Sequence, residues 1–243
     1  MSPFYGRTLA RIHHDAFGGI ARAAGPAVLR WLRTVAIRSG TVVDLGCESG
    51  ILLAALGRAG YRTVGVDASP AMLRLARKTA PGAMLRRGSL FTAPLPPCDV
   101  VTATGEALCY LPPGPGPAPS LRTLFRRVRL ALRPGGLFIF DVLVERRGTP
   151  MAYRTWMTGP GWAVLVDVSE DRRRGVVTRD ILIFRKGSGG YQRTRERHRA
   201  RRLSRARVLA DLRAAGFAAR TARGYGKHPL PQGRLIFIAR RNA

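Results

Sequence analysis

Residues 42–50, VVDLGCESG, form the segment that most constrains how this chain folds. An apolar run ends at Asp44, enters a turn bracketed by Gly46 and Gly50, and leads into a helix that begins at Ile51. This order of strand, turn and helix presents backbone N–H groups and a helix N-terminus to a ligand. A phosphate-binding P-loop is excluded, because no Gly-Lys-Ser/Thr follows, and the glycine spacing also departs from GxGxxG.

Alternating strand and helix patterns continue from this segment to about residue 144. Strands are predicted at residues 41–45, 63–67, 83–86, 99–104 and 137–144. Ser69 and Pro70 form a helix start, with Ser as the cap and Pro at the first position. Such alternation with short turns is typical of a parallel sheet flanked by helices.

The remaining segments follow other patterns. Residues 5–36 are predicted to be mostly helical. After residue 150 three β-like stretches, WAVLVDVSED, GVVTRDILIFRKG and GYQRTRERHRARRL, follow one another without helices, which predicts an antiparallel meander. A helix at 206–215 and strands at 219–225 and 235–239 are expected to end the chain.

Asp67 supports a nucleoside site beside the first turn. It ends the second strand, 21 positions after Gly46. Because the carboxyl ends of parallel strands share one edge of the sheet, Asp67 can accept hydrogen bonds from two ribose hydroxyls there.

Four segments carry a resemblance to a known family. VVDLGCESG, GVDASPAMLRLAR, CDVVTATGEALCYL and LRPGGLFIFDVL, in this order and spacing, resemble the class I S-adenosylmethionine-dependent methyltransferases over about residues 40–145. The N-terminal IHHDAF with Tyr5 and the late RGYGKHPLP are similar to a bacterial group of such enzymes. The resemblance implies an α/β, Rossmann-like fold with a mainly parallel seven-stranded sheet, and S-adenosyl-L-methionine as cofactor, released as S-adenosyl-L-homocysteine.

With this resemblance the chain divides into four expected parts. Residues 1–39 are an N-terminal helical cap, and residues 40–149 are the cofactor-binding half of the methyltransferase domain. Residues 150–203 are an antiparallel β insertion after the fifth strand that caps the substrate. Residues 204–243 supply a helix and β-hairpin that complete the sheet.

The resemblance also implies which residues contact the cofactor. The first turn would line the methionine part of the cofactor, and Asp67 would hold the ribose. Ala68 and Met72 would lie near the adenosine, and Ser89 and Leu90 would edge the adenine. Thr104 and Gly105 would pass under the sulfonium. The residues carried over are Asp44, Gly46, Cys47, Gly50, Asp67, Ala68, Met72, Ser89, Leu90, Thr104 and Gly105. The alternative for Gly46 and Gly50 is an ordinary tight turn between a strand and a helix. The alternative for Asp67 is a residue that starts a helix or lies in a turn.

Glu48 departs from the resemblance, because the family usually has Gly or another small residue at this point. We favour an interpretation in which its side chain points into solvent and only its backbone matters. Alternatively, its carboxylate binds the ammonium group of the cofactor. A third alternative is that a bulky anion here weakens cofactor binding and leaves a poor or inactive enzyme.

Methyl transfer from a sulfonium mainly requires alignment and exclusion of water, and a base only if the acceptor must lose a proton. Glu106 could contact the cofactor or orient an acceptor, or satisfy free N–H groups in the first turn of a helix. Tyr110 could line the pocket or simply pack. His13 and His14 lie on a segment that covers the cofactor in similar enzymes; each could instead be a surface or structural histidine. His198 and His228 are weaker candidates.

The net charge of +28 does not by itself identify a partner. Of the 42 basic residues 39 are Arg, a bias that a GC-rich genome produces without selection for binding. In a strand, alternate residues share one face, so Arg193, Arg195, Arg197, Arg199 and Arg201 would lie opposite Thr194, Glu196, His198 and Ala200. That arginine face is either solvated or binds an anionic substrate or RNA.

We expect a small-molecule acceptor that is methylated at an oxygen or nitrogen atom and that could carry phosphate or carboxylate groups. No [DNS]PP[YF] signature follows the fourth strand, so nucleic acid is less favoured. The alternatives are an RNA methyltransferase and an inactive cofactor-binding protein. The three cysteines lack metal-type spacing, so we expect no metal. The sequence shows no apolar leader and no apolar run of membrane-spanning length, so we expect a soluble, cytoplasmic protein. A monomer or a homodimer is expected.

Overall fold

The structure is a computed structural model of the chain, and it describes residues 4–114, 116–146 and 148–242. Its centre is a seven-stranded sheet in which β13 is antiparallel to both neighbours and all other pairs are parallel. The spatial order is β10 (Phe217–Ala222), β13 (Arg234–Arg241), β5 (Leu132–Leu143), β4 (Cys98–Ala103), β1 (Thr41–Leu45), β2 (Arg62–Asp67) and β3 (Met84–Arg87). The predicted fold class is therefore confirmed.

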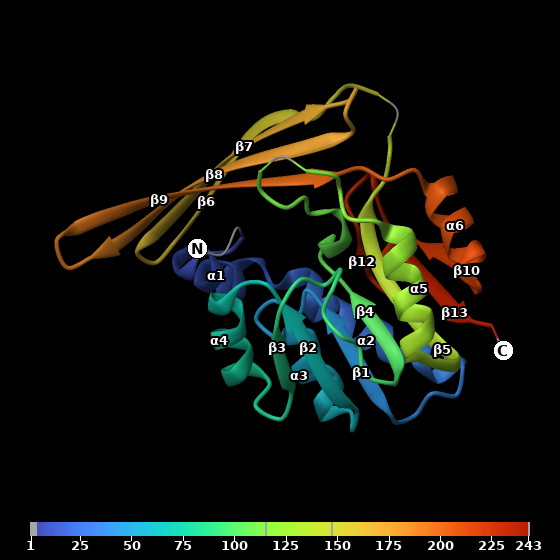
Figure 1. Cartoon of the computed structure of the whole chain (residues 1–243). Coiled ribbons are helices and arrows are strands. Elements are labelled where there is room, and N and C mark those ends of the chain that lie inside the picture. The colour runs from blue at the N-terminus through green and yellow to red at the C-terminus, as the bar shows by residue number, and fades with distance from the viewer. Residues whose placement is uncertain (1–3, 115, 147, 243) are drawn as a thin grey trace.

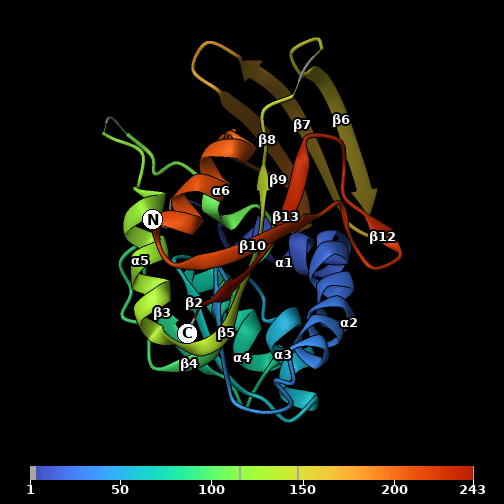
Figure 2. The same ribbon diagram turned by 90° about the vertical axis from the view of Figure 1, so that its right-hand side faces the viewer.

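Helices cover both faces of this sheet (Figures 1 and 2). Helices α2 (Gly19–Thr34), α3 (Ile51–Arg58) and α4 (Pro70–Thr79) lie on one face, and α5 (Leu121–Ala131) and α6 (Arg205–Ala214) on the other. Successive strand residues point to opposite faces. Val42 accordingly packs in the cluster with α2 and α3, while Val43 packs in the cluster with α5 and α6.

Local signals explain where the helices begin. The Ser69 hydroxyl accepts a hydrogen bond from the N–H of Met72, with Pro70 at the first helical position, as predicted. Ser120 and Ser204 cap α5 and α6 in the same way. Among the helices of the described chain, none is long and apolar enough to cross a membrane.

The N-terminal segment lies between the two halves of the molecule. Helix α1 (Arg7–Ile12) continues into one π-helical turn, His13–Phe17, before α2 begins. On one side Ala10 packs against Ala71 and Met72 of α4. On the other, Leu9 and Ile12 pack against the inserted sheet.

The insertion is a four-stranded antiparallel meander, here called the cap sheet. It consists of β6 (Ala152–Gly159), β7 (Trp162–Asp171), β8 (Val176–Gly187) and β9 (Gly190–Arg201). Figure 1 shows it projecting above the carboxyl ends of the parallel strands and over α1. The sequence predicted three strands, which was wrong. Strand β6 was missed because it is exposed on both faces, so it has no alternation of buried residues.

Two other boundaries differ from prediction. The strand expected at 219–225 is split into β10 and a two-residue strand β11 (Gly224–Tyr225), which pairs with β12 (His228–Pro229). Strand β5 begins at Leu132, where the helix was expected to have ended in Arg-Pro-Gly-Gly. Pairing of Leu132 with Cys98 starts the strand there.

Candidate active site

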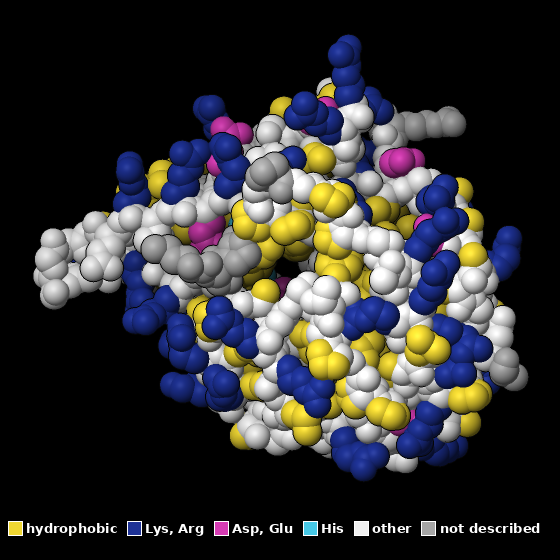
Figure 3. All heavy atoms as spheres, in the orientation of Figure 1, with side chains coloured by type: hydrophobic (Ala, Val, Ile, Leu, Met, Phe, Trp, Pro, Cys, Tyr) yellow, Lys and Arg dark blue, Asp and Glu magenta, His cyan; other side chains and the backbone are white. Residues whose placement is uncertain are grey.

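Two adjoining cavities lie where the carboxyl ends of the parallel strands meet the cap sheet. The sheet-edge cavity, of about 230 Å³, is formed by the turns after β1, β2, β3 and β4 and is roofed by Phe4 and Tyr5. The cap cavity, of about 350 Å³, lies between α1, the π-helical turn and the cap sheet. Four residues line both cavities: Tyr5, Glu48, Gly105 and Tyr110. In the view of Figure 3, a hollow bordered by hydrophobic side chains lies near the centre of the molecule.

Asp67 has the geometry expected of a ribose ligand. One carboxylate oxygen accepts from the N–H of Ser69 at 2.7 Å and the other from the N–H of Glu48 at 2.9 Å. Each oxygen retains capacity for a further hydrogen bond, and the side chain lines the sheet-edge cavity. Burial raises the pKa of Asp67 to about 6, opposed by its backbone hydrogen bonds.

The structure brings most of the predicted cofactor residues together. Lining the sheet-edge cavity are Gly46, Glu48, Asp67, Ala68, Ser89, Leu90 and Gly105. Thr104 lines the cap cavity instead. Close approach at the first turn also requires glycine, because a Cβ on Gly46 would lie 2.9 Å from the Cβ of Ala107. The residues present therefore fit a nucleoside-bearing cofactor.

Four predicted cofactor residues line neither cavity. Asp44 is buried behind the sheet-edge cavity and accepts from the Thr102 hydroxyl at 2.7 Å, and burial raises its pKa to about 7. Cys47 and Met72 are buried in hydrophobic clusters. Gly50 has φ 79° and begins α3 tightly against Ala76. These residues shape the turn from beneath.

Glu106 has a partner that sequence did not reveal. Its side chain makes no helix-capping bond; its carboxylate lies 2.6 Å from Arg179 of the cap sheet and 3.8 Å from Arg234 of β13. The backbone N–H groups of Gly105 and Glu106, both at positive φ, donate to the buried Asp141. The first-turn helix role is therefore wrong, and Glu106 links the cap sheet to the parallel sheet.

Glu48 does not point into solvent as we favoured. Its side chain is 23% exposed and lies in the wall shared by the two cavities, against Gly105 and with Oε2 3.9 Å from Nδ1 of His13. Burial, reinforced by the charges of Asp67 and Asp44, raises the pKa of Glu48 to about 8.

The two N-terminal histidines have different surroundings. His13 lines the cap cavity and packs edge-on against Tyr5, with ring centroids 4.9 Å apart. Burial lowers its pKa to about 4. His14 Nδ1 is instead 2.8 Å from the Ser49 hydroxyl, and His14 lines neither cavity.

Tyr110 both packs and lines the pocket. Its hydroxyl lies 3.2 Å from that of Tyr5, and its ring contacts His198 edge-on. Burial and the charge of Glu106 raise the pKa of Tyr110 to about 12, so its hydroxyl stays protonated.

His198 and Glu196 of β9 are site residues that sequence reasoning underestimated. His198 is 1% exposed, lines the cap cavity and lies 2.9 Å from the Glu196 carboxylate. That carboxylate also accepts from the backbone N–H groups of Tyr5 and Gly6, at 2.9 and 2.8 Å. The alternation in β9 had placed both residues opposite the arginines, but only the tertiary structure shows that their face covers the site.

No group of three His, Cys, Asp or Glu side chains within the described part of the chain could hold a metal ion. The three cysteines are free and buried.

The fold and the site together define a Rossmann-like methyltransferase architecture. Residues 43–140 match the family described as a methyltransferase domain. An S-adenosylmethionine-dependent methyltransferase from Clostridium acetobutylicum superimposes with a TM-score of 0.78 at 16% identity, covering 97% of this chain and 98% of that one.

Two further solved structures are similar over almost their whole length. CalS10, an amino pentose methyltransferase from Micromonospora echinaspora, has a TM-score of 0.77 at 21% identity, with 98% of both chains covered. The sugar N-methyltransferase KedS8 from Streptoalloteichus sp. has a TM-score of 0.78 at 20% identity, covering 100% of this chain and 98% of that one. The matched spans include the residues of the cap sheet.

Curated relatives match over shorter segments. The ribosomal protein L11 methyltransferase of Photorhabdus laumondii is 30% identical over 124 residues, 50% of this chain and 40% of that protein. That of Alteromonas mediterranea is 44% identical over 66 residues, 27% of this chain and 23% of that protein. The chain thus spans less than half the length of these relatives.

Residues 43–140 thus match a methyltransferase domain, and the whole chain has the fold of S-adenosylmethionine-dependent methyltransferases, which agrees with the resemblance found in the sequence. CalS10 was solved with S-adenosylmethionine and the similar DhpI with S-adenosylhomocysteine, which are the cofactor and product expected from the sequence.

Proposed function

We propose that this protein transfers the methyl group of S-adenosylmethionine to a nitrogen or oxygen atom of a small-molecule acceptor. The observation that carries the proposal is the pair of adjoining cavities that share Tyr5, Glu48, Gly105 and Tyr110. The sheet-edge cavity would take the cofactor, and the cap cavity would take the acceptor.

When bound, the cofactor supplies a methyl group on a positively charged sulfur that is ready for in-line displacement. Asp67 would hold the ribose, and Gly46 and Gly105 would let the backbone approach closely. The cap sheet and the N-terminal segment would exclude water and align the acceptor. In this scheme residues 1–39 and 150–203 are caps, residues 40–149 hold the cofactor, and residues 204–243 complete the sheet.

A polar molecule of about sugar size suits the cap cavity. CalS10 and KedS8, named for an amino pentose and for sugar N-methylation, match this chain over the cap sheet as well as the parallel sheet. The three arginines that line the cavity are each close to a carboxylate: Arg179 to Glu106, Arg202 to Glu170 and Arg234 to Asp141, each pair at 2.6 Å. We therefore propose a neutral or cationic acceptor instead of the anionic one considered from sequence.

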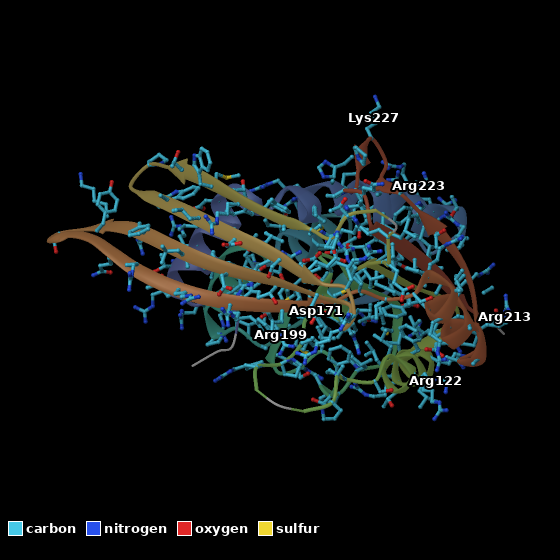
Figure 4. The ribbon with its side chains drawn as sticks, turned by 90° about the horizontal axis from the view of Figure 1, so that it is seen from above. Arg122, Asp171, Arg199, Arg213, Arg223 and Lys227 are labelled. Carbon is cyan, nitrogen blue, oxygen red and sulfur yellow. The ribbon has the colours of Figure 1, made fainter. Side chains whose placement is uncertain are left out.

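The arginine face of β9 does not support an RNA acceptor. Arg195 and Arg197 bind Asp180 at 3.0 and 2.8 Å, on the face of the cap sheet opposite His198. Arg199 lines a separate hollow with Asp171, both labelled in Figure 4. Lys and Arg side chains are spread over the whole face in Figure 3, as a compositional bias would produce.

The proposal is tested first by thermal unfolding with S-adenosylmethionine, S-adenosylhomocysteine or NAD. A ligand at a hundredfold excess over its Kd adds about 2.7 kcal/mol, which raises Tm by roughly 5–10 °C for a chain of this length. We expect the shift with both adenosyl ligands and none with NAD. Mass spectrometry should then detect a methylated product in a panel of amino and hydroxyl sugars. Binding of the cofactor without transfer to any acceptor would support the inactive binding protein instead.

A further inference from the structure

Two polar side chains face each other in the wall between the cavities without a hydrogen bond between them. Glu48 Oε2 and His13 Nδ1 are 3.9 Å apart, too far for a direct hydrogen bond. His13 Nδ1 is buried and has no hydrogen-bond partner among the described residues. A buried polar atom of this kind carries a free-energy penalty of about 1–3 kcal/mol until a ligand or water satisfies it.

A nitrogen about 2.9 Å from each atom would bridge this gap. A primary amine has two N–H hydrogens, one for each acceptor, and its lone pair remains free. A hydroxyl group has one hydrogen, so beside an ionised Glu48 it would leave either Glu48 or His13 unsatisfied. The pair therefore discriminates between the two nucleophiles by the number of hydrogens they carry.

We propose that the acceptor is a primary amine and that Glu48 and His13 hold its nitrogen between the two cavities. This inference rests on the proposed function. It specifies which atom of the acceptor attacks the methyl group and which residues bind that atom.

The surroundings favour an amine as well. Burial, followed by the charges of Asp67 and Asp44, raises the pKa of Glu48 to about 8, and a cationic amine bound beside Glu48 would favour its ionised, hydrogen-bond-accepting form. The rings of Tyr5 and Phe17 pack against His13, and aromatic faces attract amines in their cationic form. Burial lowers the pKa of His13, so the ring remains neutral, and in the tautomer with its hydrogen on Nε2 the Nδ1 atom accepts a hydrogen bond.

The backbone at Glu48 is a further indication that its side chain has a role. Its φ of 50° lies in the left-handed region, which favours glycine. Strained backbone of this kind is concentrated at functional sites.

An amine that binds as an ammonium would first give one proton to the Glu48 carboxylate, which frees the nitrogen lone pair. That lone pair would form the new N–C bond while the C–S bond of the cofactor breaks and its electron pair stays on sulfur. The products would be a secondary ammonium, protonated Glu48 and S-adenosylhomocysteine, and Glu48 would then release its proton to solvent. General-base residues of this kind contribute roughly 10²–10⁴-fold to rate.

The competing occupant of the pair is the ammonium group of the cofactor itself. The experiment therefore measures cofactor affinity and turnover separately in the intact protein. The variants are Glu48→Gln and His13→Phe. The matched control is Asp15→Asn, because Asp15 is exposed and pairs with Arg11 on the same segment. The probes are aminohexoses with the amino group at each ring position, beside the corresponding hydroxyl sugars.

We expect the unmodified protein to methylate or bind at least one aminohexose, with kcat/KM at least about a hundredfold above its hydroxyl partner. Glu48→Gln should lower kcat by about a hundredfold or more, with the calorimetric Kd for S-adenosylhomocysteine within threefold of the unmodified protein. His13→Phe should act in the same direction, and Asp15→Asn should change neither quantity.

Three results would overturn the inference. The first is a tenfold weaker Kd for S-adenosylhomocysteine in Glu48→Gln, with kcat retained at saturating cofactor. The second is equal methylation of amino and hydroxyl sugars. The third is no turnover or binding of any aminohexose by the S-adenosylhomocysteine complex. Failure of the proposed function is distinct, because the unmodified protein would then bind no S-adenosylhomocysteine or transfer no methyl group to any sugar.

Discussion

Asp141, in the middle of β5, should be the carboxylate whose loss most damages both stability and the site. It is fully buried and accepts hydrogen bonds from the N–H groups of Gly105 and Glu106 at 3.0 and 2.8 Å. It also accepts from the Tyr225 hydroxyl and from the Arg234 guanidinium, both at 2.7 Å. One side chain thus fixes the turn that lines both cavities and neutralises a buried arginine.

The change to test is Asp141→Ala. It removes one partner of a buried ion pair, which costs about 3–5 kcal/mol because Arg234 stays buried. For a chain of this length that corresponds to a fall in Tm of roughly 6–20 °C. Asp141→Asn preserves the shape and some hydrogen bonds, so its effect should be smaller.

The assay is thermal and urea unfolding, with Asp167→Ala as the matched control. Asp167 pairs with Arg154 at 3.1 Å, but the two side chains are 53% and 85% exposed. Such pairs contribute about 0–1 kcal/mol. The reasoning would be refuted if Asp141→Ala unfolded within about 2 °C of Asp167→Ala. Affinity for S-adenosylhomocysteine should also fall in Asp141→Ala alone.

Three further predictions concern single side chains. Asp67→Asn should weaken S-adenosylhomocysteine binding by about ten- to a hundredfold, because charge-assisted hydrogen bonds to the ribose contribute about 1.5–3 kcal/mol; unchanged calorimetric affinity would remove Asp67 from the site. The pKa of Glu48 is raised from 4.5 to about 8, so between those pH values the folded protein binds more protons than the unfolded chain. The free energy of unfolding should therefore fall as the pH rises from 4.5 to 8. Glu48→Gln should reduce that fall in urea titrations at pH 5 and 8, and an unchanged difference would contradict the assignment. Ser204→Ala should cost about 1 kcal/mol through loss of the α6 cap, and no change in the urea midpoint would contradict that.

Local patterns in the sequence were enough to predict most of the fold. Burial on both faces predicted β1 with the correct ends, and Ser69 with Pro70 predicted the start of α4. These signals lie within a few residues of the feature they specify. Strand β6 and the short hairpin of β11 and β12 have no such signal, because β6 buries no residue and the hairpin strands contain two residues each.

The sequence also predicted that the proposed cofactor residues would lie together, since they follow consecutive strands whose carboxyl ends must share one edge. The acceptor side was not. His13 and His14 are neighbours in sequence, yet only His13 reaches a cavity. Nothing in either residue's local pattern distinguishes the two.

The sequence by itself therefore determined the parallel sheet and its turns and located the proposed nucleoside site, because those depend on local periodicity and on glycine, proline and serine at particular positions. The tertiary structure alone decided that Glu48 faces His13 and that His198 and Glu196 cover the site. The reason is physical: α1 packs between α4 and the cap sheet, and this packing joins segments that lie far apart in the chain.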